Sequence, residues 1–533
     1  MPQFLTRIRR GCLALGLGLL LRAVFPTEEA AAEAAVDAPS TAVLTCAALL
    51  REDFTRIPDA PTALLSTTLV GKSKEANEFC QVSGFVAPQI QFELRLPTGT
   101  WNGRYLQAGC SGLCGQIFID QCADALAQDF AVAAQNMGHV GNFWSDPLWA
   151  SERSLRRDFG RRSTHVVAVA MKAIIERFYG APPAYAYFRG CSTGGREGLS
   201  EAQHFPGDFD GIVAGDPAFP GRLGAFANNW DARQLLDDND ELVFSQDDLK
   251  FLHDAVLYGC DGLDGLEDGI IEDPRNCRFD VSTLECAAGD TSRCLTKKQV
   301  AAAQNLYSGP RTRKGVRLYP GQTPFGSELA WDGANRRSIA SAALRYLAFD
   351  EVRPDYEYRN FNFDEDVDDV EAQARIYDPV APRERPDLSA FRRQGGKLII
   401  YHGWADPGVP PEGTLDYYAK VVADEGGLDS VREWFRVFMI PGMYHCRGGA
   451  APNTFDFLSA MIDWVEKGEV PDGIVATQFD GEKLVRTRPL YAYPTVARYK
   501  GTGDVDVAAS WGPVAPAEPR DDNIPWLWAP KGN

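Results

Sequence analysis

Short apolar runs separated by polar segments predict a core of strands and helices in this chain of 533 residues. The run at 184–189 has the length of a buried strand, and the segment 197–204 that follows it fits a helix. Two later runs, at 397–401 and 434–440, also predict strands, and each leads into a glycine-containing loop. Strands joined to helices by tight turns are typical of the α/β class.

The turn between the first strand and its helix carries the motif G-x-S-x-G, in the segment Gly190-Cys191-Ser192-Thr193-Gly194-Gly195-Arg196. Glycine is required at 190 and 194 because a Cβ atom there would clash with the neighbouring strand or helix. The motif alone occurs by chance in many chains, but between a strand and a helix it is typical of the nucleophile elbow of an α/β-hydrolase. Ser192 is therefore the predicted nucleophile, and a packing turn with an incidental serine is the alternative.

The two later strands supply candidate partners for this serine, in the chain order Ser, acid, His that an α/β-hydrolase follows. Asp406 lies in the loop 402–407 after the first of these strands, where the acid of such a triad is found. His445 lies in the loop 441–446 after the second strand. We predict that His445 is the general base and that Asp406 fixes its tautomer and stabilises the imidazolium.

Other residues that could take these roles fit them less well. His204 lies in the elbow helix, too close in sequence to return to the serine, and His253 lies in a polar helix of the middle region. His402 precedes Asp406 on the same loop and fits a structural histidine at a strand end. Asp210 could compete as the acid, but it better fits a cap of the turn into the next strand.

Residues 1–33 have the pattern of a secretory signal peptide, because basic residues precede an apolar core that is too short to span a membrane. The small-residue rule places cleavage at about residues 25 to 37. No later stretch is long and apolar enough to cross a bilayer, so we expect an exported protein, periplasmic or extracellular. Of the twelve cysteines only Cys12 lies in this segment, and the others then enter an oxidising compartment.

Two of these cysteines adjoin the predicted catalytic residues, since Cys191 precedes Ser192 and Cys446 follows His445. If Ser192 and His445 touch, their neighbouring cysteines are close enough to form a disulfide. Such a bridge would pin two loops that are far apart in sequence, and the chain-entropy model assigns it at most about 5 kcal/mol.

Together these motifs resemble those of the tannase and feruloyl esterase family, whose signature is Cys-Ser, Asp and His-Cys with a disulfide behind the triad. Here the signature reads Cys191-Ser192, Asp406 and His445-Cys446, and it is supported by the segments 205–215, 402–407 and 441–446. The similarity covers residues 45–505. It implies a serine carboxylesterase that acts on esters of aromatic acids, feruloyl, galloyl or related, through an acyl-enzyme. Asp216 departs from the pattern, because the family tends to have a small apolar residue there.

The predicted hydrolase core divides into two halves around a long middle region. We expect the first half at 40–220, a lid domain at 221–384, the second half at 385–505 and a C-terminal tail at 506–533. Insertions of this size commonly form a lid that shapes the pocket, and the resemblance implies one here. Several of its side chains could bind the substrate's ring or an anionic group, or could simply form lid core: Trp230, Phe325, Trp331, Tyr346, Phe349, Arg336, Arg337 and Arg345.

The segment 260–270 within the lid contains three Asp-Gly pairs. Carboxylates and carbonyls in tight turns suit a hard cation, above all calcium, and an ordinary series of Asp-Gly turns is the alternative. The spacing and the closing residue are not those of an EF-hand. The resemblance implies a structural calcium ion, bound by the side chains of Asp261, Asp264 and Asp268 and by the backbone oxygens of Leu266 and Ile270.

The resemblance also implies three further disulfides, Cys46–Cys80, Cys260–Cys277 and Cys286–Cys294. The remaining Cys110, Cys114 and Cys122 leave an odd count. We expect Cys122 to bridge either Cys110 or Cys114 and to leave one thiol free, and the sequence does not decide between the two.

Two backbone amides are predicted to form an oxyanion hole. The loop within 105–115 lies where the hydrolase fold supplies one of them, and we expect the Gly112 amide to serve. The other is the amide of Thr193, directly after the nucleophile.

A formal net charge of −19, from 73 acidic and 54 basic residues, argues against nucleic acid and anionic membranes as partners. A small aromatic ester is the expected partner. Two other functions stay open: a catalytically inactive hydrolase fold that acts as a binding module, and a peptidase that uses the same triad. The presence of Ser192, Asp406 and His445 argues against the binding module.

Overall fold

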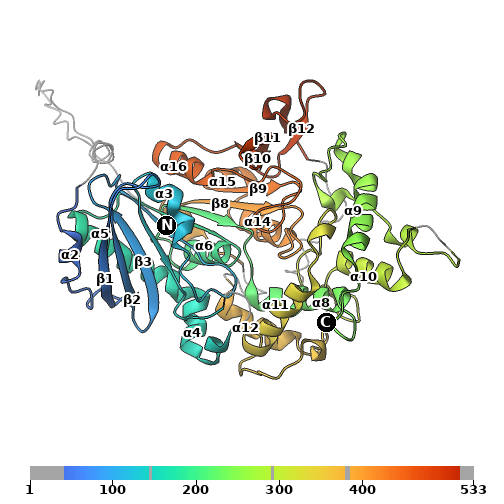
Figure 1. Ribbon diagram of the computed structural model, residues 1–533, viewed down its shortest axis with the longest axis horizontal. Coiled ribbons are helices and arrows are strands. Elements are labelled where there is room, and N and C mark those ends of the chain that lie inside the picture. The colour runs from blue at the N-terminus through green and yellow to red at the C-terminus, as the bar shows by residue number, and fades with distance from the viewer. Residues whose placement is uncertain (1–40, 143–146, 290–292, 379–384, 517–533) are drawn as a thin grey trace, which may run out of the picture. The chain divides into compact units, whose positions relative to one another are not determined.

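Nine strands form one mixed sheet in the computed structural model, which describes residues 41–142, 147–289, 293–378 and 385–516 (Figure 1). The strand order is β1-β2-β3-β5-β4-β6-β7-β8-β9. Neighbours are antiparallel from β1 to β5 in this order and parallel from β5 to β9. The α/β class that the sequence predicts is confirmed. The strands are β1 (Thr62–Val70), β2 (Phe79–Val86), β3 (Ile90–Pro97), β4 (Arg104–Ala108), β5 (Ala131–Gln135), β6 (Tyr185–Cys191), β7 (Gly211–Gly215), β8 (Lys397–Gly403) and β9 (Phe435–Ile440).

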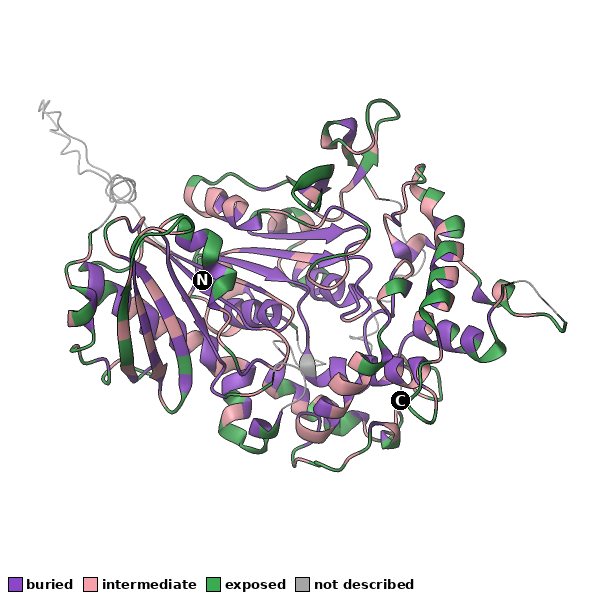
Figure 2. Cartoon of the chain, in the orientation of Figure 1, coloured by how far each residue is buried: buried purple, intermediate pink, exposed green. Residues whose placement is uncertain are grey.

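Apolar side chains cover both faces of the parallel strands, as the buried colouring of the central arrows in Figure 2 indicates. Ile212 and Ala214 of β7 pack in one cluster with α5 and α6, whereas Val213 between them packs in a second cluster with α16. Because successive side chains point to opposite faces and both faces are covered, these strands read as continuous apolar runs. The helices outside the middle region are α2 (Cys46–Leu49), α3 (Ala123–Ala127), α4 (Arg153–Arg157), α5 (Ser163–Tyr179), α6 (Thr193–His204), α13 (Ser389–Arg393), α14 (Glu412–Asp424), α15 (Leu428–Arg432) and α16 (Phe457–Lys467).

The elements predicted around the serine are confirmed with small shifts at their ends. β6, β8 and β9 coincide with the three predicted strands to within two residues at each end. The helix after the serine, α6, begins at Thr193 rather than at 197. It starts earlier because the elbow turns directly into the first helical turn, with Ser192 as the residue before the helix.

The middle region, from α7 to α12 between β7 and β8, is mainly helical, and its helices α8 to α11 gather to one side of the sheet in Figure 1. It has two apolar clusters of its own, one around α8, α11 and α12 and the other around α9 and α10. Its helices are α7 (Pro220–Arg222), α8 (Asn229–Leu235), α9 (Gln246–Cys260), α10 (Lys297–Ser308), α11 (Gly333–Tyr346) and α12 (Val367–Tyr377). After the core come two small antiparallel sheets, formed by β10 (Gly473–Asp480) with β11 (Lys483–Tyr491) and by β12 (Val496–Tyr499) with β13 (Trp511–Val514).

Five disulfides join cysteines of the described residues. Four are the expected pairs, Cys191–Cys446, Cys46–Cys80, Cys260–Cys277 and Cys286–Cys294. The fifth is Cys110–Cys114, so the prediction that Cys122 bridges one of these two is wrong. Cys110 and Cys114 lie across one tight turn, with Cα atoms 5.6 Å apart. Cys122 instead packs in the apolar cluster beside β5, and burial raises the pKa of its free thiol to about 12.

The predicted signal peptide, residues 1–33, lies outside the described residues, as does the part of the predicted tail beyond residue 516. The described part of that tail contains β13. Within the described ranges, no helix combines the length and the apolar character that crossing a membrane requires.

Candidate active site

The serine elbow is a strained turn between β6 and α6. Ser192 has a φ of 63°, a left-handed conformation that is rare for a residue with a side chain. A Cβ atom on Gly190 would lie 2.7 Å from the Cα of Gly194, and one on Gly194 would lie 2.8 Å from the carbonyl oxygen of Cys110. Both glycines are therefore required by close backbone contacts, for the reason that the sequence predicts.

Asp406 and His445 are in direct contact. The Nδ1 atom of His445 lies 2.6 Å from Oδ2 of Asp406, which is fully buried. The other oxygen, Oδ1, accepts hydrogen bonds from the backbone amides of Gly408 and Val409 at 2.7 and 2.9 Å. Burial alone would raise the pKa of Asp406, but the His445 charge and the side-chain contacts with His402 and His445 hold it well below the ordinary value. The carboxylate is therefore ionised and holds the Nδ1 edge of the imidazole.

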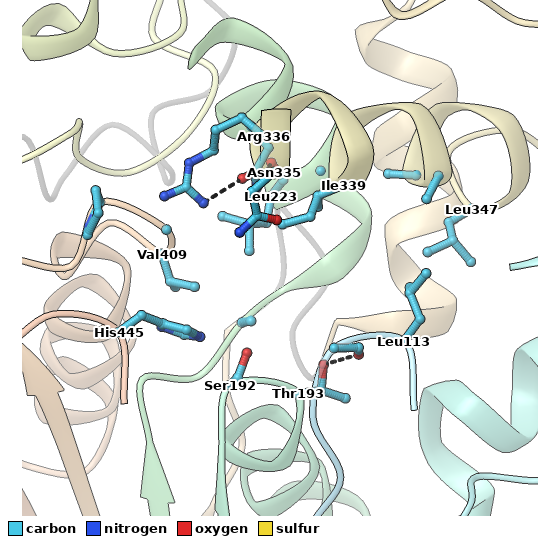
Figure 3. A pocket seen from close by; sticks show the side chains of 18 of the residues that line it. Leu113, Ser192, Thr193, Leu223, Asn335, Arg336, Ile339, Leu347, Val409 and His445 are labelled. Atoms are coloured by element: carbon cyan, nitrogen blue, oxygen red, sulfur yellow. Dashed lines mark hydrogen bonds between the residues drawn. The ribbon is translucent and has the colours of Figure 1, made fainter. Parts of the chain in front are cut away.

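The imidazole is charged more readily than a free histidine. Burial lowers the pKa of His445, but the Asp406 charge and hydrogen bond outweigh burial and raise it. Figure 3 shows the ring of His445 pointing toward the hydroxyl of Ser192, and both residues line one cavity. The disulfide Cys191–Cys446 joins the residue before the serine to the residue after the histidine, with Cα atoms 6.1 Å apart. The three predicted triad residues are therefore brought to one place.

The competing candidates lie elsewhere or have other partners. His402 is fully buried, with Nδ1 2.7 Å from the hydroxyl of Thr414 and Nε2 2.9 Å from the carbonyl oxygen of Val409. Asp210 accepts a hydrogen bond from the backbone of Ala186 at the amino ends of β6 and β7, the opposite ends from Ser192.

Two further histidines do not fit the role of the base, one because of its partner and the other because of its position. His253 is buried with Nδ1 2.7 Å from Oε2 of Glu328. His204 is the last residue of α6, the helix that starts beside the serine.

The two predicted oxyanion residues face the same cavity. The hydroxyl of Thr193 donates to the carbonyl oxygen of Gly112 at 2.6 Å, and both residues line the cavity with Ser192. Thr193 is the first residue of α6, so its amide belongs to the positive end of the helix.

Glu197 positions the loop that contains Gly112, and the sequence analysis missed this residue. It is buried on α6, and its carboxylate accepts the backbone amide of Cys110 at 2.8 Å and the hydroxyl of Thr164 at 2.7 Å. The detectable signal was a carboxylate in the first turns of the elbow helix, where an apolar core residue would be expected.

Asp216 is the second residue that the sequence analysis left without a role. It is fully buried at the carboxyl end of β7, beside the triad. One ligand atom of each of Asp216, Asp406 and His445 lies within 4.8 Å of the others. The signal for it was the same as for Asp406, a carboxylate directly after a strand.

The cavity has a volume of about 260 Å³ and mainly apolar walls. The middle region contributes one wall, with Leu223, Ile339 and Leu347 among the residues labelled in Figure 3. Arg336 of α11 is the cationic side chain among the lining residues, and its Nη1 donates to Oδ1 of Asn228 at 3.1 Å. A single cation in an apolar pocket suits a ring that bears an anionic or polar substituent.

The other lid candidates do not line this cavity. The five aromatic residues pack in apolar clusters or against other rings, as core residues do: Trp230, Phe325, Trp331, Tyr346 and Phe349. Arg337 pairs with Asp240 at 2.9 Å, and Arg345 pairs with Glu357 at 3.0 Å. The aromatic side chain among the cavity's lining residues is Tyr444, from the loop that also carries His445.

The Asp-Gly segment 260–270 forms a tight loop around Asp261. The carboxylate of Asp261 accepts the backbone amides of Asp268, Gly269 and Ile270 at 2.8–3.3 Å. Burial, with the neighbouring Asp268 charge as a lesser cause, raises the pKa of Asp261.

Asp264 and Asp268 complete the acidic loop. Burial also raises the pKa of Asp264, and Asp268 again adds to the effect. One oxygen of Asp268 pairs with Arg488, whereas its Oδ1 is buried with no partner among the described residues. Among the described residues, three sets of ligand-type side chains have atoms within 4.8 Å of one another, and the loop aspartates form none of them. The donor chemistry fits a hard cation, although the carboxylates do not converge to that distance.

Comparison with known proteins places the chain among esterases. The family model described as tannase and feruloyl esterase matches residues 73–514. Mono(2-hydroxyethyl) terephthalate hydrolase of Piscinibacter sakaiensis is 33% identical over 517 residues, covering 82% of this chain and 85% of that protein. Probable feruloyl esterase B-1 of Aspergillus oryzae is 34% identical over 470 residues, covering 81% and 83%. The crystal structure of feruloyl esterase B from Aspergillus oryzae superposes with a TM-score of 0.75 at 29% identity, covering 85% of this chain and 97% of that one.

Proposed function

The chain belongs to the tannase and feruloyl esterase family and is a carboxylesterase, and we propose that it hydrolyses esters of aromatic acids with Ser192 as the nucleophile. The observation that carries this proposal is the 2.6 Å contact between His445 and Asp406 in a cavity that Ser192 also lines. Three separate segments of the chain converge there, which a packing turn with an incidental serine does not require.

The proposed reaction is a two-step acyl transfer. Because Nδ1 of His445 is held by Asp406, its Nε2 is the nitrogen available to take the proton of Ser192. The serine oxygen attacks the ester carbonyl, and the imidazolium then gives its proton to the leaving alcohol. Water then attacks the acyl-enzyme carbonyl while His445 takes its proton, and His445 returns that proton to the serine oxygen as the acid leaves. Asp406 stays ionised throughout and stabilises the imidazolium.

The amides of Thr193 and Gly112 are proposed to hold the oxyanion of each tetrahedral intermediate. The hydrogen bond from the Thr193 hydroxyl to the Gly112 carbonyl fixes the two residues against each other before substrate binds. Donors that are held in place cost no reorganisation when charge develops on the oxygen.

The cavity supports an aromatic acyl group with a polar or anionic substituent remote from the ester. Its walls are apolar, and Arg336 is 6% exposed at a site where it can meet a phenolate or a carboxylate. We assign the wall that carries Arg336 to a lid, formed by the region between β7 and β8. The role of Arg336 in binding the substituent is tested by measuring how Arg336→Lys changes KM for charged and for uncharged aromatic esters.

Export of the protein and a structural calcium ion in the lid are proposed with this function. Five disulfides among the described residues support an oxidising compartment. The unpartnered Oδ1 of Asp268 and the raised pKa values of Asp261 and Asp264 support a cation in the loop 260–270, which would bind through carboxylate and carbonyl oxygens and hold the loop closed.

The test is a hydrolysis panel of methyl ferulate, methyl gallate, mono-hydroxyethyl terephthalate and para-nitrophenyl acetate, with casein as the peptidase control. We expect turnover of one or more aromatic esters, none of casein, and loss of activity in Ser192→Ala. Turnover of the acetate alone would keep the triad but contradict the aromatic specificity. A folded protein that hydrolyses nothing would favour a binding module, and cleavage of casein would favour a peptidase.

A further inference from the structure

A second buried carboxylate stands beside the active site, at the carboxyl end of β7. This strand lies between β6, which leads to Ser192, and β8, which leads to Asp406. Asp216 follows β7 directly, is fully buried and has a φ of 38°. The role assigned to Asp216 below concerns the proposed ester hydrolysis and rests on that function.

The contacts of Asp216 leave its negative charge only partly satisfied. Its backbone amide donates to the carbonyl oxygen of Tyr401 at 2.8 Å, and Oδ1 accepts the amide of Gly403 at 3.1 Å. Oδ2 lies 3.4 Å from Sγ of Cys191. That sulfur is bonded to Cys446 and has no hydrogen to donate. A buried carboxylate with so few donors is costly to ionise unless a nearby cation compensates it.

The compensating groups are the two histidines of the site. Oδ1 of Asp216 lies 3.7 Å from Nε2 of His402, which in turn lies 3.3 Å from Oδ2 of Asp406. The ligand atoms of Asp216 and His445 lie within 4.8 Å of each other. Buried charges within this separation are strongly coupled electrostatically, even without a hydrogen bond between them.

The groups that face this carboxylate come from every strand end around it. From β8 and its loop come Tyr401, His402 and Asp406, from the loop after β9 comes His445, and from β6 comes the uncharged disulfide sulfur of Cys191. Burial has the largest effect on Asp216 and raises its pKa. The charge of His402 opposes burial, the charge of Asp406 adds to it, and the result is a pKa raised to about 6.

Asp216 in turn affects the pKa of His445, the proposed general base. The charge of Asp216 helps to raise the pKa of His445, after the larger effects of burial and Asp406, while Arg336 of the lid opposes it.

We propose that Asp216 is a positioning residue for the catalytic histidine: when ionised, its carboxylate acts with Asp406 to stabilise the His445 imidazolium that forms as Ser192 attacks. Protonation of Asp216 removes this support. Asp216 is not among the residues that line the cavity, so its effect on the reaction passes through His445. Activity on the acid side then depends on two groups, the imidazole and this carboxyl.

The matched variant is Asp216→Asn. Asparagine tolerates a positive φ and its amide oxygen can still accept the Gly403 amide, so the turn is preserved while the charge is lost. We expect kcat to fall about tenfold with KM unchanged, because one pKa unit of imidazolium stabilisation is a factor of ten. The acid limb of the kcat/KM profile should move to lower pH by about one unit, since removing a negative charge lowers the pKa of His445.

The control is Asp210→Asn, which removes a carboxylate that also accepts a backbone amide, but at the amino end of β7. It should leave kcat and the acid limb unchanged. A purely structural role of Asp216 would lower the thermal midpoint without moving the acid limb, and that result would overturn the proposal.

Labelling of Ser192 by a fluorophosphonate separates this inference from the proposed function, because it needs no ester substrate. If the wild type does not label, the proposed function fails. If it labels and Asp216→Asn labels with the same rate and the same acid limb, the inference alone fails.

If Asp216→Asn does not fold, the imidazole signals of His445 are followed by NMR in folded Ser192→Ala across pH 4 to 9. A second titration step from a neighbouring carboxyl is expected on these signals. A single step would contradict the proposal.

Discussion

Two groups of aspartates in this molecule are neutralised in different ways. At the active site both oxygens of Asp406 have partners, two backbone amides on Oδ1 and His445 on Oδ2. In the loop 260–270, Oδ1 of Asp268 is buried with no partner among the described residues. Burial and the Asp268 charge also raise the pKa of Asp261 and Asp264, whereas the pKa of Asp406 is lowered.

The difference separates a site whose partners the protein supplies from one where, in our proposal, a cation supplies the missing partner. A catalytic carboxylate must be ionised before substrate arrives, so its partners are built into the fold. A structural loop can leave its carboxylates partly unsatisfied, because an ion that binds only the folded state then stabilises that state. Three predictions test the two halves of this contrast, and a fourth extends it to the buried carboxyls Asp231 and Glu412.

The largest effect is expected from Asp406→Asn, which removes the partner of His445. We expect kcat to fall by about 10⁴, because an amide at this position no longer holds the imidazole in the productive tautomer. Steady-state kinetics on the best aromatic ester measure the loss, with Asp210→Asn as the control. A loss below tenfold in a folded variant would mean that Asp406 is not what holds the imidazole in its productive tautomer.

The next effect is expected from loss of the disulfide behind the site, in the variant Cys191→Ser with Cys446→Ser. The bridge spans 255 positions, and in the chain-entropy model its removal costs up to about 5 kcal/mol of unfolding free energy. Denaturant unfolding measures the change.

The control is Cys286→Ser with Cys294→Ser, whose bridge spans only 8 positions and is expected to cost about half as much. Equal losses in the two pairs would show that loop length does not set the stabilisation. Equal losses would also show that the Cys191–Cys446 bridge has no special part in stabilising the active site.

Calcium is expected to stabilise the loop 260–270, the second of the two sites compared above. At a hundred times its dissociation constant it should raise the unfolding free energy by roughly 3 kcal/mol, and a chelator should reverse this without changing kcat at low temperature. The thermal midpoint with calcium and with chelator measures it. In Asp264→Asn, which can keep the hydrogen bond to the Leu266 amide, most of the response should vanish, and an undiminished response would place the ion elsewhere.

The smallest effect is expected from pH. Burial raises the pKa of Asp231 and of Glu412 to about 7, so in the folded state each prefers its neutral form. Their contribution to stability is complete below the unfolded pKa near 4 and is lost as pH rises through 7. We expect the unfolding free energy to fall by about 1 kcal/mol for each of the two groups between pH 6 and 8.

Denaturant unfolding at pH 6 and at pH 8 measures this loss. Asp231→Asn should reduce it, because the group no longer titrates. A stability that rises over this interval would contradict the assignment of both carboxyls.

Much of the core could be predicted from sequence because its signals are local. The glycines of the elbow, the apolar runs of β6, β8 and β9, and the carboxylate and histidine that follow two of these strands all lie within short segments. Their positions along parallel strands bring their carboxyl ends to one edge of the sheet, and so the triad residues met there.

Other features could not be predicted, because they depend on distances between segments. Cys122 has the same local surroundings as a bridging cysteine, and only its packing beside β5 shows that its thiol stays free. The five aromatic residues of the middle region carry no local signal that separates pocket from core, and none of them is among the residues that line the cavity.

By itself the sequence determined the elbow, the chain order of Ser192, Asp406 and His445, and the acidic residues of the loop 260–270, since each follows from residue types and their positions along the chain. Only the tertiary structure decided which arginine reaches the cavity and that Asp216 stands beside Asp406. Burial and electrostatic coupling fall steeply with distance, and distance between remote segments is a property of the folded chain alone.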